Sequence, residues 1–478
     1  MGALSMSIVF EDHFHFGPDD LRRILDAALQ TGGDFADLFL EYRVYNSIHM
    51  EEDLIKETSE SISLGLGIRV WSGEKTGYGF TNDLAFDKIL RAARSAAAIA
   101  SSGGRTAPAA GLIRATSPLS VYPLRETPHR GDLTGKIGLV KDAYAACQSH
   151  HPAVKKVKAG LQDQIQYVTI VNSEGLLISD ARPLVKLTCV AIAEKGVARE
   201  YGYSGGGGRV GLEYFAENLS PAVIGREAAR EAVQLLDARD APAGEMPVVL
   251  SPGHAGVFIH EAVGHLLEAD FNRKKTSVFW NKMGRRVGTS LVSIYDDPTI
   301  PGFRGSYAVD DEGTVPSKTP LIEKGVVVGL LQDRLSARLM GKTPTGHGRR
   351  QDYTDYPIPR MANTFIAAGE DDPAEIIRSV RKGFYADQFS GGQVEDSGKF
   401  TFSVTSGFLI EEGRLTAPVK QATLIGSNVE ILKRVEMVGS DLTFGLQTGS
   451  CGKEGQDVPV TDGCPTIKIS RMTVGGRE

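Results

Sequence analysis

The sequence predicts an α+β protein of two domains, in which mainly antiparallel sheets are flanked by helices. The chain has 478 residues. At roughly 100–200 residues per domain, this length predicts more than one domain. Helical segments do not alternate regularly with strands, which makes a doubly wound parallel fold less favourable. Beyond residue 245 most of the pattern is typical of strands.

Helices and strands are mixed in the first hundred residues. Apolar residues at helical spacing predict a helix over residues 19–30, and the Ala-rich segment 84–100 predicts a second one. Strands are predicted over 38–44 and 62–71. The latter turns into 76–80 as a hairpin.

The middle of the chain opens with residues 101–118, which are rich in Ser, Gly, Ala, Pro and Thr. This composition indicates a linker or a long surface loop. A helix is predicted over 133–148, followed by strands within 154–203. A further helix is predicted from Ser220-Pro221, an N-cap and first-turn pair, through residue 236.

The main domain boundary is predicted within residues 237–245, which contain a proline and a glycine. The predicted domains are therefore 1–240 and 241–478, with 101–118 as a candidate break inside the first. A strand over 246–250 opens the second domain, which is rich in β-structure apart from the helix that follows and a short helix over 373–382.

Composition narrows the class of protein. The net charge is −6, and no long run of Lys or Arg is present, so direct nucleic-acid binding is not expected. Four cysteines do not form a disulfide framework, which favours a reducing compartment. Residues 1–7 have no secretory signal pattern. No apolar run is long enough to span a membrane, so a cytoplasmic location is expected.

The segment most informative about chemistry is residues 251–270. Ser251 and Pro252 predict the start of a helix, and the apolar spacing predicts that this helix is largely buried. It carries His260, Glu261 and His265. Buried ionisable groups are costly unless they are paired or bound to a metal. Two imidazoles can bind Zn²⁺, and an adjacent Glu can act as general base on water. The alternative is a pair of hydrogen-bonded core histidines.

The spacing of the two histidines is one residue longer than in the His-Glu-x-x-His pattern. In a regular α-helix, five residues place the two side chains about 140° apart, too far for one ion. A local π-type widening would absorb the extra residue. Gly264, directly before His265, would make that distortion easier. The motif therefore predicts an irregular helix as well as a metal-binding helix at the start of the C-terminal domain.

A catalytic zinc site usually has a third protein ligand and one open position. The residues alone leave six candidates for that ligand: Cys451, Cys464, Glu268, Asp270, His254 and His347.

Three further segments have both a functional and a structural interpretation. Residues 343–350 form a basic loop in which Arg349 could meet a substrate carboxylate, or which is simply solvated. Gly391, Gly392 and Gln393 precede a strand. An exposed edge there could hold an extended peptide by β-augmentation, although an ordinary bulged strand explains them as well. Residues 205–208, four glycines, are predicted to form a flexible turn.

Several separate blocks, in one order along essentially the whole chain, resemble the TldD/PmbA family, once described as modulators of DNA gyrase. The blocks that carry the resemblance are residues 259–265, 270–273, 276–279, 310–314, 338–341, 343–346, 391–394, 451–456 and 473–476.

This resemblance implies a zinc-dependent peptidase that acts on unfolded or extended peptides. It implies that His260, His265 and Cys451 are the zinc ligands and that Glu261 is the catalytic base. Family members act with a related TldE/PmbA-like subunit that lacks the metal motif, so a heterodimer is expected, with a homodimer as the alternative. The implied roles are processing of peptide precursors and degradation of antitoxins.

The same resemblance bears on two other candidates. His347 stands where the family commonly has Asn, and Cys464 stands where no Cys is required, which favours Cys451 as the third ligand. The competing hypotheses are a non-enzymatic, protein-binding regulator of the gyrase-modulator type and another kind of metal hydrolase. A ligand as distant as Cys451 predicts that the site forms only when the C-terminal β region folds back onto the helix.

Overall fold

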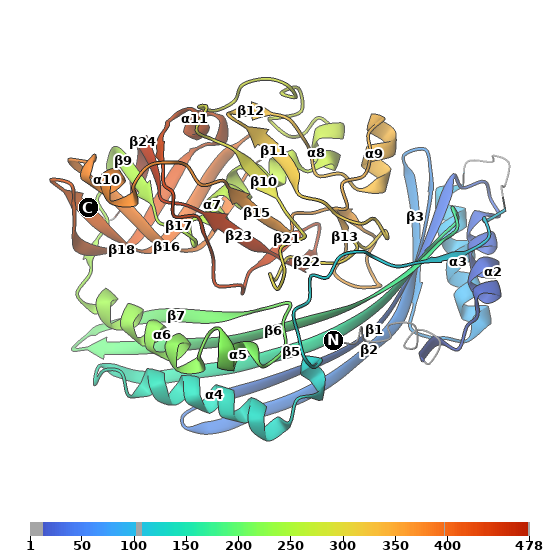
Figure 1. Ribbon diagram of the computed structural model, residues 1–478, viewed down its shortest axis with the longest axis horizontal. Coiled ribbons are helices and arrows are strands. Elements are labelled where there is room, and N and C mark those ends of the chain that lie inside the picture. The colour runs from blue at the N-terminus through green and yellow to red at the C-terminus, as the bar shows by residue number, and fades with distance from the viewer. Residues whose placement is uncertain (1–12, 102–107, 396, 477–478) are drawn as a thin grey trace.

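The computed structural model describes residues 13–101, 108–395 and 397–476 (Figure 1). The predicted α+β class with mainly antiparallel sheets is confirmed. Residues 1–7, examined for a secretory signal, and residues 102–107 of the predicted linker lie outside the described part. Among the described residues, no helix is long and apolar enough to cross a membrane.

The N-terminal half, up to residue 238, is built on one seven-stranded sheet with the order β3-β2-β1-β5-β6-β4, in which β7 also pairs with β6. All neighbours are antiparallel except β4 and β6. The strands are β1 (Phe35–Glu51), β2 (Leu54–Ser72), β3 (Lys75–Thr81), β4 (Ile113–Ala115), β5 (Val154–Asn172), β6 (Leu176–Lys195) and β7 (Ala198–Gly208). Several run much longer than the predicted segments.

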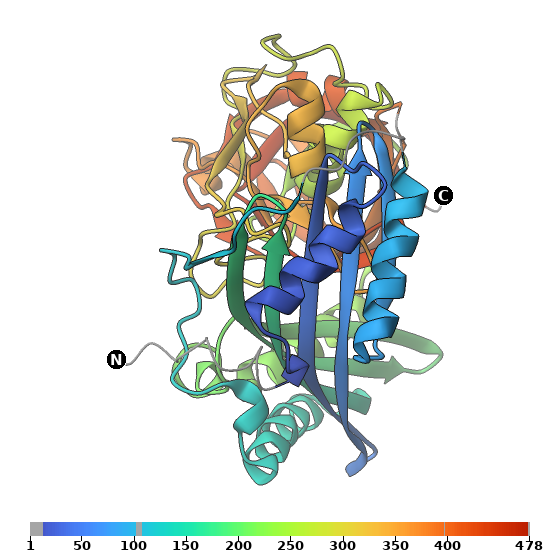
Figure 2. The same cartoon turned by 90° about the vertical axis from the view of Figure 1, so that its right-hand side faces the viewer.

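Helices cover the outer face of this sheet, and the C-terminal half lies against its inner, concave face (Figures 1 and 2). Side chains along β1 point alternately to the two faces of the sheet, and each face has its own packing partner. Leu38 and Leu40 pack with the helices at one end, whereas Phe39 points the other way and clusters with Val309 of the C-terminal half. Because side chains alternate between faces, one strand contributes to both layers.

The predicted helices of this half are confirmed to within two residues at each end. They bury the apolar stripe that predicted them, as Leu21, Ile24 and Leu25 do in α2. The helices are α2 (Pro18–Leu29), α3 (Phe86–Ala100), α4 (Leu133–Gln148) and α6 (Pro221–Leu236), with the short η1 (Pro128–Arg130) and α5 (Tyr214–Glu217) between them.

The flexible turn predicted at residues 205–208 is wrong. These glycines form the end of β7 and pair with residues 185–188 of β6. The physical reason is close approach of neighbouring backbones. A Cβ on Gly208 would lie 2.2 Å from the carbonyl oxygen of Gly302, and φ at Gly208 is +136°. A run of glycines therefore marks tight packing here rather than flexibility.

The C-terminal half contains two larger sheets and two hairpins. One sheet has the order β19-β24-β9-β16-β17-β18-β8, and because β24 also pairs with β18, its five inner strands close into a small barrel. Its strands are β8 (Arg239–Asp240), β9 (Gly244–Leu250), β16 (Lys382–Val394), β17 (Lys399–Glu411), β18 (Arg414–Ser427), β19 (Val435–Val438) and β24 (Ile467–Gly475).

The second sheet has the order β12-β11-β10-β15-β23-β20. Its strands are β10 (Ile294–Asp296), β11 (Thr319–Glu323), β12 (Val326–Val327), β15 (Asn363–Ile366), β20 (Thr443–Phe444) and β23 (Thr461–Cys464). The hairpins are β13 (Gly348–Arg349) with β14 (Ile358–Pro359) and β21 (Ser450–Lys453) with β22 (Gln456–Pro459). Short helices connect the strands: α8 (Ala269–Arg273), α9 (Arg334–Met340), α10 (Pro373–Arg378) and α11 (Asn428–Lys433).

The helix with the histidines lies between these two sheets. It consists of α7 (Gly256–Ile259), the π-helical turn η2 (His260–Gly264) and the 3₁₀ turn η3 (His265–Leu267). It contacts β16 on one side and β15 and β23 on the other. Phe258 packs on Phe400 and Phe402 in the largest apolar core of the molecule. Close packing against both sheets fixes the helix in place.

The predicted start of this helix at Ser251-Pro252 is wrong, because the helix begins at Gly256. The Ser251 amide donates to the Ala386 carbonyl and its hydroxyl donates to the Asp387 carbonyl. Ser251 thus prolongs the pairing of β9 with β16, and its hydroxyl cannot cap a helix. The predicted helix over 373–382 likewise ends earlier, at Arg378.

Gly256 is expected to be essential to the packing of α7. A Cβ there would lie 2.6 Å from the Gly463 amide nitrogen and 2.7 Å from the Asp462 carbonyl carbon. Both are backbone atoms of β23, which cannot rotate away. Gly256→Ala should lower the free energy of unfolding by about 1–3 kcal/mol, measured by urea denaturation.

The matched control is Gly138→Ala in α4, where nothing lies within 4 Å of the added methyl group. Alanine there should stabilise the protein by about 0.5–1 kcal/mol, because glycine is unfavourable inside a helix. If both variants shift stability in the same direction, the close contact of α7 with β23 is not what makes Gly256 necessary.

Glu41 predicts a pH dependence of stability. Its fully buried carboxylate accepts a hydrogen bond from the Tyr353 amide of the C-terminal half, and burial raises its pKa to about 7. The folded state therefore holds this proton more tightly than the unfolded state does. The stability that this provides is complete below about pH 4.5 and is lost as the pH rises through 7. Thermal unfolding of Glu41→Gln should vary less between pH 5 and 8 than that of the wild type, and an unchanged profile would contradict the assignment.

Candidate metal centre

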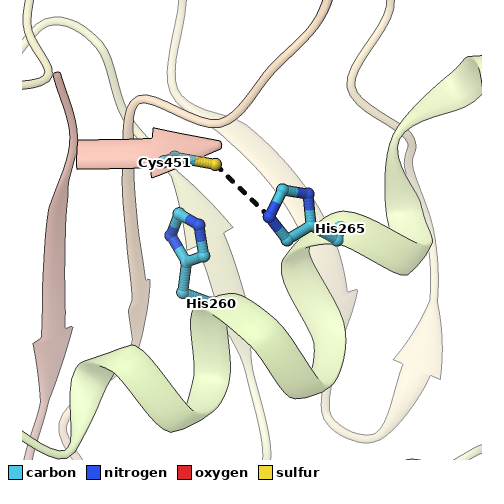
Figure 3. Close-up of side chains that lie close together, drawn as sticks. All are labelled: His260, His265 and Cys451. Atoms are coloured by element: carbon cyan, nitrogen blue, oxygen red, sulfur yellow. Dashed lines mark hydrogen bonds between the residues drawn. The ribbon is translucent and has the colours of Figure 1, made fainter. Parts of the chain in front are cut away.

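The five residues His260–Gly264 form a single π-helical turn inside the helix (Figure 3). The distortion predicted from the long His-to-His spacing is confirmed. The wider turn brings the two imidazoles onto one side, with ring centroids 5.1 Å apart and the rings nearly perpendicular. A π-helical turn contains about one more residue than an α-helical turn, so it accommodates the extra residue between the two histidines.

Gly264 contributes through space rather than through backbone freedom. Its backbone is ordinary right-handed helix, with φ −56° and ψ −58°. A Cβ at this position would lie 1.9 Å from the sulfur of the buried Met361. The prediction that the backbone freedom of glycine eases the distortion is therefore wrong, and what requires a glycine here is the close packing of Met361 against the turn.

Cys451 reaches the two histidines from the hairpin of β21 and β22. Its sulfur lies 3.3 Å from Nε2 of His265, a contact drawn as the dashed line in Figure 3. One nitrogen from each histidine and the Cys451 sulfur all lie within 4.8 Å of one another. This is the only group of three such donors for a metal ion in the part of the chain that the structure describes.

Each imidazole is oriented by a carboxylate on its other nitrogen. Nδ1 of His260 lies 2.7 Å from Oδ1 of Asp462, and Nδ1 of His265 lies 3.1 Å from Oε2 of Glu268. With Nδ1 of each ring held by a carboxylate, Nε2 is the nitrogen that is available to a metal ion. Burial would lower the pKa of both imidazoles, but Asp462, Glu268 and the Cys451 thiolate outweigh it and raise both pKa values, that of His265 to about 10. A carboxylate behind a histidine ligand is a common arrangement at metal sites, because it fixes the tautomer and the ring orientation.

Lys453 ties this arrangement to the hairpin that carries Cys451. Its Nζ lies 3.1 Å from Glu268 and 2.8 Å from Asp270, and all three side chains are buried. Burial alone would raise the pKa of Glu268, but the charges of Lys453 and His265 outweigh it and lower that pKa to about 2. Glu268 and Asp270, two of the six candidate ligands, are thus engaged elsewhere.

The cysteine has the electrostatic environment of a thiolate. Burial would raise the pKa of Cys451, yet the neighbouring His260 and His265 lower it well below its usual value. A deprotonated thiol with two imidazole nitrogens is a donor set typical of zinc. In tetrahedral zinc sites, bond lengths of about 2.0–2.3 Å place the ligand atoms roughly 3.3–3.7 Å apart. The 3.3 Å separation of sulfur and Nε2 fits that spacing.

Glu261 sits beside these donors and faces a groove of about 570 Å³ between the two halves of the chain. Its Oε2 lies 3.9 Å from Nε2 of His265, and 23% of the side chain is exposed. Burial raises its pKa, while the neighbouring histidines lower it in part. The groove is lined by residues 201–203 of β7, His254, Val257, Glu261, residues 388–392 of β16 and residues 445–450.

The β16 strand passes along this groove with one edge unpaired. It pairs with β17 as far as Val394, but with β9 only over Phe384–Ala386, and no other described strand covers the rest. Gly391 and Gly392 line the groove, whereas Gln393 is exposed and is not part of the lining. Bulges interrupt the pairing between Ala386 and Gly391.

The other candidates of the sequence lie apart from the three donors. His347 is buried and hydrogen-bonded to Asp296 and Thr345. Burial raises the pKa of Cys464, a direction that disfavours the thiolate. Burial lowers the pKa of His254, which lines the groove, to about 4. Arg349 lies in a different cavity, with its guanidinium donating to the carbonyls of Met361 and Pro459.

Asp462 is a residue that the sequence did not single out. It lies two positions before Cys464, in a segment where only the cysteine is a candidate ligand. No spacing relates it to His260, because it arrives through the parallel pairing of β23 with β15. Glu268 follows His265 by three residues, and this spacing predicts a neighbour on the same helix face. The hydrogen bond between Glu268 and His265 could therefore have been predicted from the sequence.

Two histidines and a cysteine converging beside a glutamate and a groove are the arrangement typical of a catalytic metal site in a hydrolase. The chain belongs to the TldD/PmbA family of metallopeptidases. Family models described as PmbA/TldA metallopeptidase domain 1, central domain and C-terminal domain match residues 36–100, 128–236 and 243–476.

Relatives named as TldD homologs match nearly the whole chain. A metalloprotease TldD homolog of Haemophilus influenzae is 41% identical over 465 residues, which span 95% of this chain and 96% of that protein. A zinc metalloprotease TldD homolog of Saccharolobus solfataricus is 25% identical, over 95% of this chain and 99% of that protein.

Solved structures share the fold. A Thermotoga maritima protein described as a candidate modulator of a DNA gyrase matches with a TM-score of 0.78 at 21% identity, over 96% of this chain and 99% of the other. TldE from Thermococcus kodakarensis matches with a TM-score of 0.74 at 18% identity, over 96% and 100%.

Proposed function

We propose that this protein is a zinc-dependent peptidase that hydrolyses peptide bonds in unfolded or extended peptides. One observation carries the proposal: donor atoms of His260, His265 and Cys451 converge beside the groove-facing Glu261. Several relatives are named metalloproteases, and these names support metal-dependent hydrolysis of peptide bonds as the reaction class.

In this proposal His260, His265 and Cys451 hold the metal, and the fourth position opens toward the groove. Zinc, when bound, supplies a Lewis acid at that position. Asp462 and Glu268 hold Nδ1 of the two imidazoles, which fixes the orientation of the rings and leaves Nε2 to face the metal. Glu261 accepts the proton of the attacking water and passes it to the leaving amine. Its raised pKa brings the carboxyl group closer to the pH at which it must exchange that proton.

The unpaired edge of β16 is the proposed site for the substrate backbone. An extended peptide can add there as a further strand, with its main chain bonded to the strand edge. Gly391 and Gly392 have no side chains to obstruct it. Folded proteins cannot present such a strand, which restricts the enzyme to unfolded or extended chains. Arg349 lies away from this groove, so we assign it no contact with the backbone of this peptide.

We further propose that the chain acts in the cytoplasm with a TldE/PmbA-like subunit or with a second copy of itself, in peptide precursor processing or antitoxin degradation. The family membership supports such a partner. Direct contact with nucleic acid is not part of the proposal, since the net charge is negative.

Zinc content is the first test. Purified wild-type protein should contain about one zinc ion per chain by metal analysis, and His260→Ala should contain almost none, because one of three ligands is lost. Asp462→Asn should bind zinc about 10–100-fold more weakly, since its partner imidazole loses its support. The control His150→Ala, at an exposed position, should match the wild type. Equally low zinc in all variants would refute the metal site.

Glu261→Gln separates metal binding from catalysis. The variant should keep its zinc but cleave a disordered peptide about 10²–10⁴-fold more slowly, because the amide cannot accept a proton. Chelator should abolish cleavage by the wild type. The control Glu430→Gln, an exposed residue of α11, should cleave normally. Full activity of Glu261→Gln would remove Glu261 from its role. Zinc binding without any chelator-sensitive cleavage would favour a protein-binding regulator.

A further inference from the structure

A second cavity, of about 170 Å³, lies between the concave face of the N-terminal sheet and the C-terminal half. It is distinct in composition from the groove at the metal centre. Six guanidinium groups line it against three carboxyl groups, Asp310, Asp311 and Asp457. The arginines are Arg43, Arg182, Arg209, Arg304, Arg349 and Arg350.

Three of these arginines have no carboxylate partner among the described residues. The Arg209 guanidinium donates to the carbonyls of Arg304 and Pro183. Arg349 donates to two other carbonyls, and Arg304 donates through Nε to the carbonyl of Gly449. Nη1 of Arg304 is buried and has no hydrogen-bond partner. Backbone carbonyls satisfy donors but do not neutralise charge.

The carboxylates nearby are already engaged. Asp311 pairs with Arg182 and accepts a hydrogen bond from the Arg350 amide. Asp310 accepts hydrogen bonds from the amides of Glu312, Thr314 and Gly348, and burial together with the charge of Glu312 raises its pKa well above the usual value. Asp457, at the exposed rim, forms no ion pair among the described residues. Positive charge in the cavity therefore exceeds negative charge.

Such an excess is unfavourable in a buried site. Burial, together with the charges of the neighbouring arginines, lowers the pKa of Arg209 to about 10. Burial also lowers the pKa of Arg304 to about 10. Each guanidinium nevertheless stays protonated at neutral pH, so its charge needs a counter-ion. Asp311 and Asp296 offset part of the charge of Arg349, but no described carboxylate does so for Arg209 or Arg304.

We propose that this cavity binds a compact oxyanion, a phosphate group or a carboxylate, through Arg209, Arg304 and Arg349. Guanidinium groups match such anions because their planar forks donate paired hydrogen bonds to two oxygens. The volume accommodates one oxyanion together with water. Ser450 and Asp457 are exposed at the rim, where a small anion can enter.

The anion joins the two halves of the protein. Arg209 follows β7 of the N-terminal half, whereas Arg304 and Arg349 belong to the C-terminal half. Arg304 also holds the carbonyl of Gly449, two residues before Cys451. The bound anion therefore stabilises the closed arrangement of both halves, as any ligand of the folded state does. The inference does not depend on peptidase activity.

Titration calorimetry and thermal unfolding of the full-length protein, with inorganic phosphate at constant ionic strength, test this site. Phosphate should bind with one site per chain and raise the unfolding temperature. Arg209→Met and Arg304→Met should each weaken binding about tenfold or more, because each removes charge-assisted hydrogen bonds. The unfolding temperature without phosphate shows whether each variant is folded, because each loses hydrogen bonds to backbone carbonyls as well as a buried unpaired charge.

The control Arg378→Met removes the same charge at an exposed position and should bind phosphate as the wild type does. The source of the anion is decided by competition. A short peptide with a free C-terminal carboxylate, but not its amide, should displace phosphate if the site takes a chain end. If neither the peptide with the free carboxylate nor its amide displaces phosphate, the natural ligand of the cavity is a free anion and not a chain end. The proposal is overturned if phosphate does not bind saturably, or if Arg209→Met and Arg304→Met bind it as well as Arg378→Met.

Discussion

The width of one helical turn is the constraint on which the candidate metal centre depends. His260 and His265 face the same way only because the turn between them is π-helical. That turn persists because it is enclosed by the barrel on one side and the second sheet on the other, with Met361 packed into the space beside Gly264. A regular helix would place the two imidazoles on different faces, and the carboxylates behind them would lose their partners.

Around that turn, charged groups form a chain that runs from the helix to the β-hairpin. His265 contacts Glu268, Glu268 contacts Lys453, and Lys453 lies two residues after Cys451. Removing water from these groups is costly, and the cost is offset only when every partner is present. The helix and the hairpin therefore position each other. This mutual dependence explains why a site with buried charges can be rigid without being built on a single element.

The sequence was sufficient for features that depend on local spacing. Apolar periodicity located the N-terminal helices, and the count of residues between His260 and His265 predicted the π-turn. It was insufficient where distant backbones meet. Ser251 looked like a helix cap but bonds to β16, and Asp462 reaches His260 only through a parallel strand pair. The arginines of the second cavity come from five separated places along the chain, and only one of them, the basic loop with Arg349 and Arg350, stands out in the sequence. The metal centre and the arginine cavity both depend on tertiary contacts between distant segments, whereas the π-turn depends on local spacing.

The separation of the donors along the chain has a consequence for the unfolded state. The contact between His265 and Cys451 closes a loop of 186 residues. An ion held by both residues would act as a cross-link, removing chain conformations from the unfolded ensemble in the way a disulfide does. By the loop-length relation for cross-links, that entropy loss corresponds to on the order of 5 kcal/mol. A chain whose four cysteines form no disulfide would gain a reversible cross-link of this kind, which is lost when metal is scarce and forms again when metal returns.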